Sequence, residues 1–173
     1  MLFRSGFSTF PQEGLSGASC LVGCLLMFIG GSPIGTAGGV KTVTLFLVVM
    51  NAVSFVQERK EAVLMKRKIP EEVLRKAAAI VFVHLLTVFV FTCLLLAVSP
   101  VSLEDGLFEV VSATATVGLS RGITPLLDSG GRIILICAMY LGRIAPVSLA
   151  LFFARPRPGR NDIRFAEGRF YVG

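Results

Sequence analysis

The sequence has few of the residues that build metal or catalytic centres. It contains one histidine and four cysteines among 173 residues. All four cysteines lie inside apolar runs, where cysteine usually acts as a small packing residue. Cys20 and Cys24 have the spacing of one helix face, but no second pair and no nearby histidine completes a set of metal ligands. We therefore expect structural cysteines.

The sequence also lacks the glycine that a nucleotide-binding loop requires. Residues 35–42 nearly match the phosphate-binding pattern G-x-x-x-x-G-K-[ST], but Val40 stands where the glycine before the lysine should be. The preceding apolar run is too long for the expected strand, and no alternation of strands and helices surrounds it. We therefore expect that the protein is not an enzyme and carries no cofactor.

Charged residues are few and are concentrated in two places. They make up 16% of the sequence against 54% hydrophobic residues, and the mean hydropathy is +0.78. The net charge of +6 comes largely from seven basic residues in 57–76 and five in 155–169. Both clusters flank apolar runs, as the positive-inside rule expects of cytoplasmic segments. The placement favours a membrane protein and gives no reason to expect nucleic-acid binding.

The apolar runs predict one plain membrane span and one broken span. Residues 77–98 carry no formal charge and are long enough to cross a hydrocarbon core of about 30 Å. The runs 18–29 and 43–56 are each too short, and five of the twelve residues 30–41 that follow the first run are glycine. Such irregular backbone is tolerated at membrane depth where it is buried in protein or lines a water-filled path. The pattern predicts two half-helices on a transport pathway.

The single histidine, His84, lies in the middle of the plain span. A proton relay is one interpretation of an ionisable residue at this depth. A neutral histidine bonded to a neighbouring helix is the interpretation that we prefer.

The region after the plain span predicts a pore loop. Ser102 suits a helix N-cap, and the helix from Glu104 to about Thr114 is too short to span. The segment 116–120 and the turn-rich stretch 121–131 follow it. A short helix that enters the membrane and ends at a threonine and glycine segment can direct partial negative charge and backbone carbonyls at a cation.

The last apolar run, 133–153, is predicted to be a second broken span. Gly142, Arg143 and Pro146 interrupt it, and an arginine at this depth costs several kcal/mol unless it is paired or solvated (about 2.5 kcal/mol or more). We expect 57–76 inside, 77–98 crossing outwards, 104–120 dipping in from outside, and the tail 154–173 inside. We also expect no secretory signal at the N-terminus.

Two parts of the chain are similar to each other at an offset of 112 residues. This shift places Gly6 on Gly118 and Gly30 on Gly142. Together with the topology, it predicts that 1–56 is the latter part of one helix–pore loop–helix unit and that 77–153 is a complete one. The expected fold class is therefore an all-α integral membrane protein of such repeats, each with an interrupted second helix.

The combination of motifs resembles the C-terminal part of the Trk/Ktr/HKT superfamily of cation transporters, and within it the Ktr-type (KtrB-like) potassium-uptake subunits. The segments that carry the resemblance are 4–9 (RSGFST), 27–33 (MFIGGSP), 36–42 (TAGGVKT), 112–113 (SA), 116–120 (TVGLS), 142–144 (GRI) and 166–173 (AEGRFYVG). Together they extend over nearly the whole chain.

The resemblance implies four repeats around one pore, of which this chain would hold the latter part of the third and all of the fourth. The selectivity filter would include Ser5, Gly6, Phe7, Thr116, Val117, Gly118 and Leu119, with potassium as the substrate at their carbonyls. The intramembrane gating loop would include Gly30, Gly31, Ser32, Gly35, Thr36, Ala37, Gly38, Gly39 and Lys41, facing Arg143. The implied partners are a second copy in a homodimer and a cytosolic nucleotide-binding regulatory subunit of the KtrA or TrkA type, at the cell membrane.

One alternative stays open from the sequence. A non-conducting membrane fragment, or an assembly or structural membrane protein, would account for the hydrophobicity and the basic tail. It would not account for two interrupted helices, each about 24 residues after a glycine of a pore-loop motif. The choice between potassium and sodium, and any coupling to sodium or protons, stay open at this point, and we expect the chain to be a fragment of a longer protein or a truncated reading frame.

Overall fold

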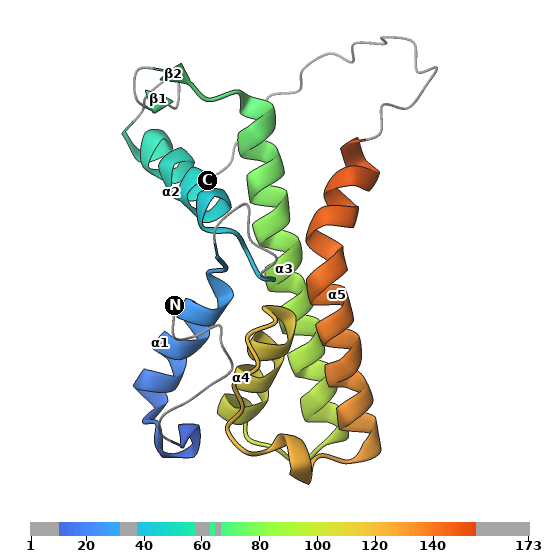
Figure 1. The fold of residues 1–173 in the computed structure, drawn as a ribbon. Helices are drawn as coiled ribbons and strands as arrows, with labels where there is room; N and C mark the ends of the chain where they lie inside the picture. The colour runs from blue at the N-terminus through green and yellow to red at the C-terminus, as the bar shows by residue number, and fades with distance from the viewer. Residues whose placement is uncertain (1–10, 32–37, 58–62, 65–66, 155–173) are drawn as a thin grey trace.

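The computed structural model describes residues 11–31, 38–57, 63–64 and 67–154, and gives only the backbone of 13, 63–64, 67–68 and 145–154 (Figure 1). The elements are η2 (Gln12–Gly14), α1 (Gly17–Phe28), α2 (Thr42–Val56), β1 (Val63–Leu64), β2 (Arg67–Lys68), α3 (Glu71–Val98), α4 (Leu103–Thr114), η3 (Thr124–Leu126) and α5 (Ser129–Ala154). The described part is helical apart from β1 and β2, a minimal antiparallel pair.

The plain span is α3, which begins earlier than the apolar run alone indicates. Pro70 is its N-cap, and Glu71 and Glu72 lie in the first turn, where the helix dipole favours acidic side chains. The helix then continues for 28 residues. Among the described residues, α3 is the one helix that is both long and apolar enough to cross a membrane by length and composition.

The predicted break between two half-helices is present. α1 begins after Ser16, whose Oγ accepts from the Ser19 N–H, and α2 begins at Thr42. The two sides of the break are joined by a parallel bridge between Ile29 and Val40. Its bonds run from the Gly30 N–H to the Val40 carbonyl at 2.5 Å and from the Val40 N–H to the Phe28 carbonyl at 3.2 Å.

α4 is a short helix, and the chain after it turns back along it (Figure 1). Ser102 caps it by accepting the Asp105 N–H at 3.2 Å, as the sequence predicts. At 1.5 Å per residue its twelve residues extend about 18 Å, against about 42 Å for α3. In Figure 1 the chain after α4 returns to the end of the molecule from which α4 starts. We call this the entry end; α1 and α5 also begin there, and β1 and β2 lie at the opposite, hairpin end.

The interruption that the sequence predicts within 133–153 is wrong. α5 is one continuous helix of 26 residues through Gly142, Arg143 and Pro146. Proline has no N–H to give to the carbonyl four residues earlier, here that of Gly142. Membrane helices tolerate such a loss because neighbouring groups satisfy the freed carbonyl, so this proline does not end the helix.

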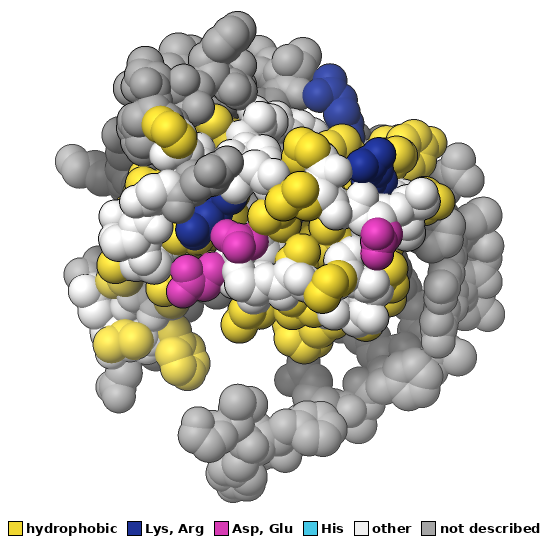
Figure 2. Space-filling view, turned by 90° about the horizontal axis from the view of Figure 1, so that it is seen from below, with side chains coloured by type: hydrophobic (Ala, Val, Ile, Leu, Met, Phe, Trp, Pro, Cys, Tyr) yellow, Lys and Arg dark blue, Asp and Glu magenta, His cyan; other side chains and the backbone are white. Residues whose placement is uncertain are grey.

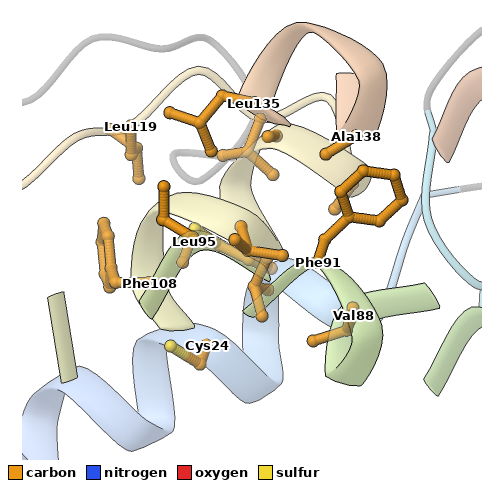
Figure 3. Close-up of a cluster of buried hydrophobic side chains, with 14 of the residues drawn as sticks. Cys24, Val88, Phe91, Leu95, Phe108, Leu119, Leu135 and Ala138 are labelled. Carbon is orange, nitrogen blue, oxygen red and sulfur yellow. The ribbon is translucent and has the colours of Figure 1, made fainter. Parts of the chain in front are cut away.

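The apolar core is built around α4. This helix packs against α1, α3 and α5, whereas α2 packs against α3. Figure 3 shows side chains from α1, α3, α4 and α5, and from the segment after α4, that meet in one cluster. The labelled residues are Cys24, Val88, Phe91, Leu95, Phe108, Leu119, Leu135 and Ala138. Large apolar side chains on the outer faces stay exposed, among them Leu25, Phe89 and Ile136. Exposed apolar faces around a buried short helix suit a hydrocarbon surrounding.

Two pairs of elements repeat at one offset along the chain. η3 begins 112 residues after η2, and α5 begins 112 residues after α1. The pairs differ at their far ends, because α1 stops at Phe28 while α5 continues past the corresponding Tyr140. The offset is the one that overlays Gly6 on Gly118 in the sequence.

Candidate functional site

The segment that follows α4, residues 115–119, turns back over the C-terminal end of that helix. The Thr116 N–H donates to the Ala113 carbonyl at 3.1 Å, and the Val117 N–H to the Ser112 carbonyl at 2.9 Å. Thr116 (φ 55°) and Gly118 (φ 86°) both have left-handed backbone. Glycine adopts this conformation without strain, but a β-branched threonine does not. Strained backbone of this kind clusters at functional sites.

The backbone of this segment has unused hydrogen-bonding groups. Val117 and Leu119 bury their side chains in the core. Within the described residues, the carbonyls of 116–119 accept no hydrogen bond from the protein, and the N–H groups of Gly118 and Leu119 donate none. Four of the predicted filter residues, Thr116 to Leu119, therefore lie together with their carbonyls unpaired by any described residue.

A pocket of about 380 Å³ borders this segment. Three elements line it: α4 supplies Glu109, Ser112 and Ala113, the following loop supplies 116–120 and Thr124, and α5 supplies Leu135, Met139 and Arg143. The predicted filter segment and the predicted gate arginine thus border one cavity, although they are far apart in the sequence.

The described end of the glycine stretch packs against the predicted filter segment, 116–119. The Gly38 N–H donates to Thr116 Oγ1 at 3.0 Å. A Cβ at Gly38 would lie 2.6 Å from the same oxygen and 3.0 Å from the Ala115 carbonyl oxygen. Gly39 has φ +78°, and a Cβ there would lie 3.4 Å from the Ala115 Cβ. Gly38 therefore has no room for a Cβ against Thr116, and position 39 favours glycine because its backbone is left-handed.

The predicted loop and filter residues are only partly covered by the structure. Gly30, Gly31, Gly38, Gly39 and Lys41 are described, and Lys41 is the N-cap of α2. The residues outside the described part are Ser5, Gly6, Phe7, Ser32, Gly35, Thr36 and Ala37. Their roles stay predictions.

At Gly142, α5 lies directly against the backbone of α4. A Cβ at this position would lie 2.1 Å from the Thr114 carbonyl oxygen and 2.5 Å from the Thr114 Cα. Thr114 is fully buried, and its Oγ1 donates to the Val110 carbonyl at 2.9 Å. The absence of a side chain at 142 therefore lets α5 pack directly on the Thr114 backbone, just before the predicted filter segment.

Arg143 is exposed and lines the pocket beside that segment. Within the described residues it makes no hydrogen bond and no ion pair. Ser32 and Thr36, the partners that the sequence suggests, lie outside those residues. Its bond to the loop stays a prediction.

Sequence reasoning missed Glu109. This residue lies on α4, is 5% exposed, and turns its carboxylate toward the loop that leaves the filter segment. It accepts hydrogen bonds from the Ser120 hydroxyl, from the Arg121 N–H at 3.0 Å and from the Thr124 hydroxyl at 3.0 Å. The sequence feature that could have revealed it is a single acidic residue in the middle of the apolar run LFEVVSAT of a short helix.

Arg121 ties the same loop to the start of α4. Its Nε lies 2.9 Å from Asp105 Oδ1, and its Nη1 lies 3.9 Å from Glu104 Oε2. The first contact is close but too poorly aligned for a hydrogen bond, and the second is long and has an exposed partner. Figure 2 views this entry end, where acidic and basic side chains lie close together among apolar ones.

His84 does not make the hydrogen bond that we preferred from the sequence, as far as the described residues show. It is buried, its ring centroid lies 5.1 Å from that of Phe28, and its Nε2 has no partner among those residues. Its contact with the neighbouring helix α1 is a ring contact. In the described part of the chain, no group of three histidine, cysteine or acidic residues could hold a metal ion.

The helical architecture, with a segment that turns back beside a pocket, is accompanied by a match to a known protein family. Residues 1–162 match the model of a family described as TrkH, cation transport protein. Because the match covers most of the chain, the chain belongs to this family, and it is a membrane protein. The resemblance drawn from the motifs is confirmed.

Individual relatives match at about one third identity. The chain is 35% identical over 171 residues to the Ktr system potassium uptake protein B of Vibrio alginolyticus, and 30% identical over 169 residues to that of Bacillus subtilis. It is 31% identical over 174 residues to the potassium/sodium uptake protein NtpJ of Enterococcus hirae. Each alignment covers 98% of this chain, but only 37%, 38% and 39% of the respective relative. The family and these relatives are transporters, which confirms that the chain is not an enzyme.

Proposed function

We propose that the chain is part of the ion-conducting subunit of a potassium uptake system, with Thr116–Leu119 as one segment of the selectivity filter. The observation that carries this proposal is the segment itself. It follows a short buried helix, turns the side chains of Val117 and Leu119 into the core, and leaves four successive carbonyls unpaired by described residues beside a pocket. Carbonyls arranged in this way can replace the water shell of a cation.

The position of α4 adds an electrostatic contribution. Its C-terminal end precedes the filter segment directly, and a helix C-terminus carries a partial negative charge. A cation beside Thr116 would therefore be stabilised by the helix end as well as by the carbonyls. The charge and the carbonyls come from backbone, so the site needs no acidic side chain of its own.

The glycine stretch is the proposed gate of this pathway. Its described end bonds to Thr116 through the Gly38 N–H, and its two sides are joined by the Ile29–Val40 bridge. These contacts place Gly38 and Gly39 beside the proposed filter segment. Arg143 borders the same pocket, and its permanent charge would hold the loop and raise the barrier to cations.

The remaining architecture follows from the same proposal. The 112-residue offset of η2–α1 and η3–α5 supports the assignment of 1–56 and 77–153 to two pore repeats, joined by the linker 57–76 and followed by the tail 154–173. The relatives are more than twice as long, so the other filter segments would come from the rest of such a protein. A homodimer, a cytosolic nucleotide-binding regulatory subunit and a cell-membrane location with a cytoplasmic C-terminus complete the proposal.

The test is transport by a chimera in which this chain replaces the aligned region of the Vibrio alginolyticus protein. The chimera, expressed in cells that lack their own potassium uptake, should restore growth at low potassium and take up potassium in preference to sodium. The unaltered Vibrio protein is the positive control, and this chain alone tests whether the isolated segment conducts. A chimera that inserts normally but takes up neither ion would contradict the proposal and favour a non-conducting membrane protein.

A further inference from the structure

Glu109 is the one acidic side chain among the described residues of the α4 core face, and its surroundings are unusual for a buried charge. Three donors converge on its two oxygens: the Ser120 hydroxyl and the Arg121 N–H on Oε1, and the Thr124 hydroxyl on Oε2. Burying a carboxylate is costly unless hydrogen bonds compensate for the lost water. All three donors belong to one short stretch of chain, so the carboxylate acts as the point around which 120–124 folds.

The loop closes on itself around this point. The Gly122 N–H donates to Ser120 Oγ at 3.0 Å, and the Ser120 and Thr124 hydroxyls lie 3.2 Å apart. Gly122 has φ 85°, a conformation that glycine adopts easily. The turn is therefore built from bonds that lead to Glu109 directly or through Ser120.

These contacts fix the filter segment at both of its ends to the same helix. The end nearest α4 is held by the Thr116 and Val117 N–H groups, which donate to Ala113 and Ser112. The far end is held by Ser120 and Arg121 on Glu109. Between these points, the N–H groups of Gly118 and Leu119 bond to no described residue. The spacing of the carbonyls along 116–119 is thus set by two attachments to α4, three or more residues apart.

We propose that Glu109 is a positioning residue that fixes the far end of the filter segment and thereby the preference for potassium over sodium. The inference rests on the proposed function, because it assumes that the carbonyls of 116–119 contact the cation. Glu109 acts through the loop and does not touch the ion. Loss of its bonds should let the segment relax, and the carbonyl spacing would then no longer distinguish two cations of different size.

A positioning role for Glu109 and a role of its negative charge lead to different rankings of the variants. In Glu109→Gln, the amide oxygen can still accept from Ser120 and Arg121, and the amide N–H can donate to the Thr124 hydroxyl, which can turn to accept. Glu109→Asp keeps the charge but is one methylene shorter. A positioning role therefore ranks Gln above Asp and Ala, whereas attraction of cations by the negative charge would rank Asp above Gln.

The test measures potassium and sodium uptake by the chimera carrying Glu109→Gln, Glu109→Asp or Glu109→Ala, with membrane levels matched by immunoblot. Glu109→Ala should reduce the potassium preference by roughly tenfold, the size that the loss of buried hydrogen bonds gives, and Glu109→Gln should stay near the parent. Glu72→Gln, which is exposed in the first turn of α3 and has no contact with this loop among the described residues, is the matched control and should change nothing.

Two outcomes would overturn the inference: an unchanged preference in folded Glu109→Ala, or a ranking with Asp above Gln. If Glu109→Ala does not reach the membrane, the double variant Ser120→Ala and Thr124→Ala removes two of the donors and should reduce the preference in the same direction. An unchanged preference there would overturn it as well. Failure of the parent chimera to select potassium would instead contradict the proposed function, so the two failures are distinguishable.

Discussion

The N–H of Gly38 donates a hydrogen bond to Oγ1 of Thr116 at 3.0 Å, which joins the glycine stretch to the segment after α4 across 78 positions of sequence. Thr116 keeps a left-handed backbone at this contact, and Gly38 has no room for a Cβ. Movement of the glycine stretch would therefore be transmitted to the first residue of the proposed filter. In the proposed transporter, gate and filter are in direct contact.

Thr116→Val should weaken this contact and release the gate. Valine has nearly the same shape as threonine but cannot accept the Gly38 N–H, and the lost bond is worth about 1 kcal/mol. A change of this size in the barrier predicts a rise of roughly three- to tenfold in the maximal potassium uptake rate of the chimera. Thr116→Ser keeps the hydroxyl and serves as the control. An equal increase in both variants would show that the hydroxyl is not what holds the loop.

Gly142→Ala should destabilise the packing of α5 on α4. The new Cβ would meet the Thr114 carbonyl oxygen at 2.1 Å, and backbone cannot give way cheaply. Overpacking of this kind costs about 1–3 kcal/mol or more, which a thermal unfolding series of the purified chimera in detergent would measure.

Gly23→Ala is the matched control for Gly142→Ala. It lies inside α1, and its Cβ would meet the Phe108 ring at an ordinary 3.6 Å. Alanine there gains up to about 1 kcal/mol of helix propensity. A melting temperature as low for Gly23→Ala as for Gly142→Ala would mean that the close approach to Thr114 is not the cause.

Helix starts could be predicted from sequence because their signals are local. Ser102, the N-cap expected from the sequence, stands before α4 in the structure. The continuity of α5 through Pro146 could not be predicted in this way, because a proline in a membrane helix is tolerated or not according to its neighbours. The same holds for the bonds of Glu109 and the contact of Gly38 with Thr116, which exist only once α4 is surrounded by the other elements.

Arg143→Ala should raise the maximal uptake rate of the chimera with little change in apparent affinity. The arginine is exposed beside the filter segment, and its removal takes away a fixed positive charge near the path and the proposed bonds to the loop. The expected increase is again roughly three- to tenfold. Arg143→Lys, which keeps the charge but not the forked donor group, shows which of the two matters. A normally inserted Arg143→Ala variant that transports no faster than its parent would place the gate elsewhere.

The orientation in the membrane can be tested by cysteine labelling of intact cells. Lys66→Cys and Arg160→Cys, each on a cysteine-free background, should resist an impermeant thiol reagent, because the basic residues around both positions predict a cytoplasmic location. Leu126→Cys lies on η3 at the entry end, is 82% exposed, and should react. Labelling at either of the first two positions, or protection of the third, would show that the predicted topology is wrong.

The most direct test of the central claim is the ratio of potassium to sodium uptake in Gly118→Ser. Gly118 has φ 86° within the filter segment, and any side chain there strains the backbone that carries the carbonyls. We expect a chimera that reaches the membrane at the parental level but prefers potassium by roughly tenfold less, the change that about 1.4 kcal/mol gives. An unchanged ratio of the two uptake rates in a normally expressed Gly118→Ser variant would contradict the claim that Thr116–Leu119 selects the cation.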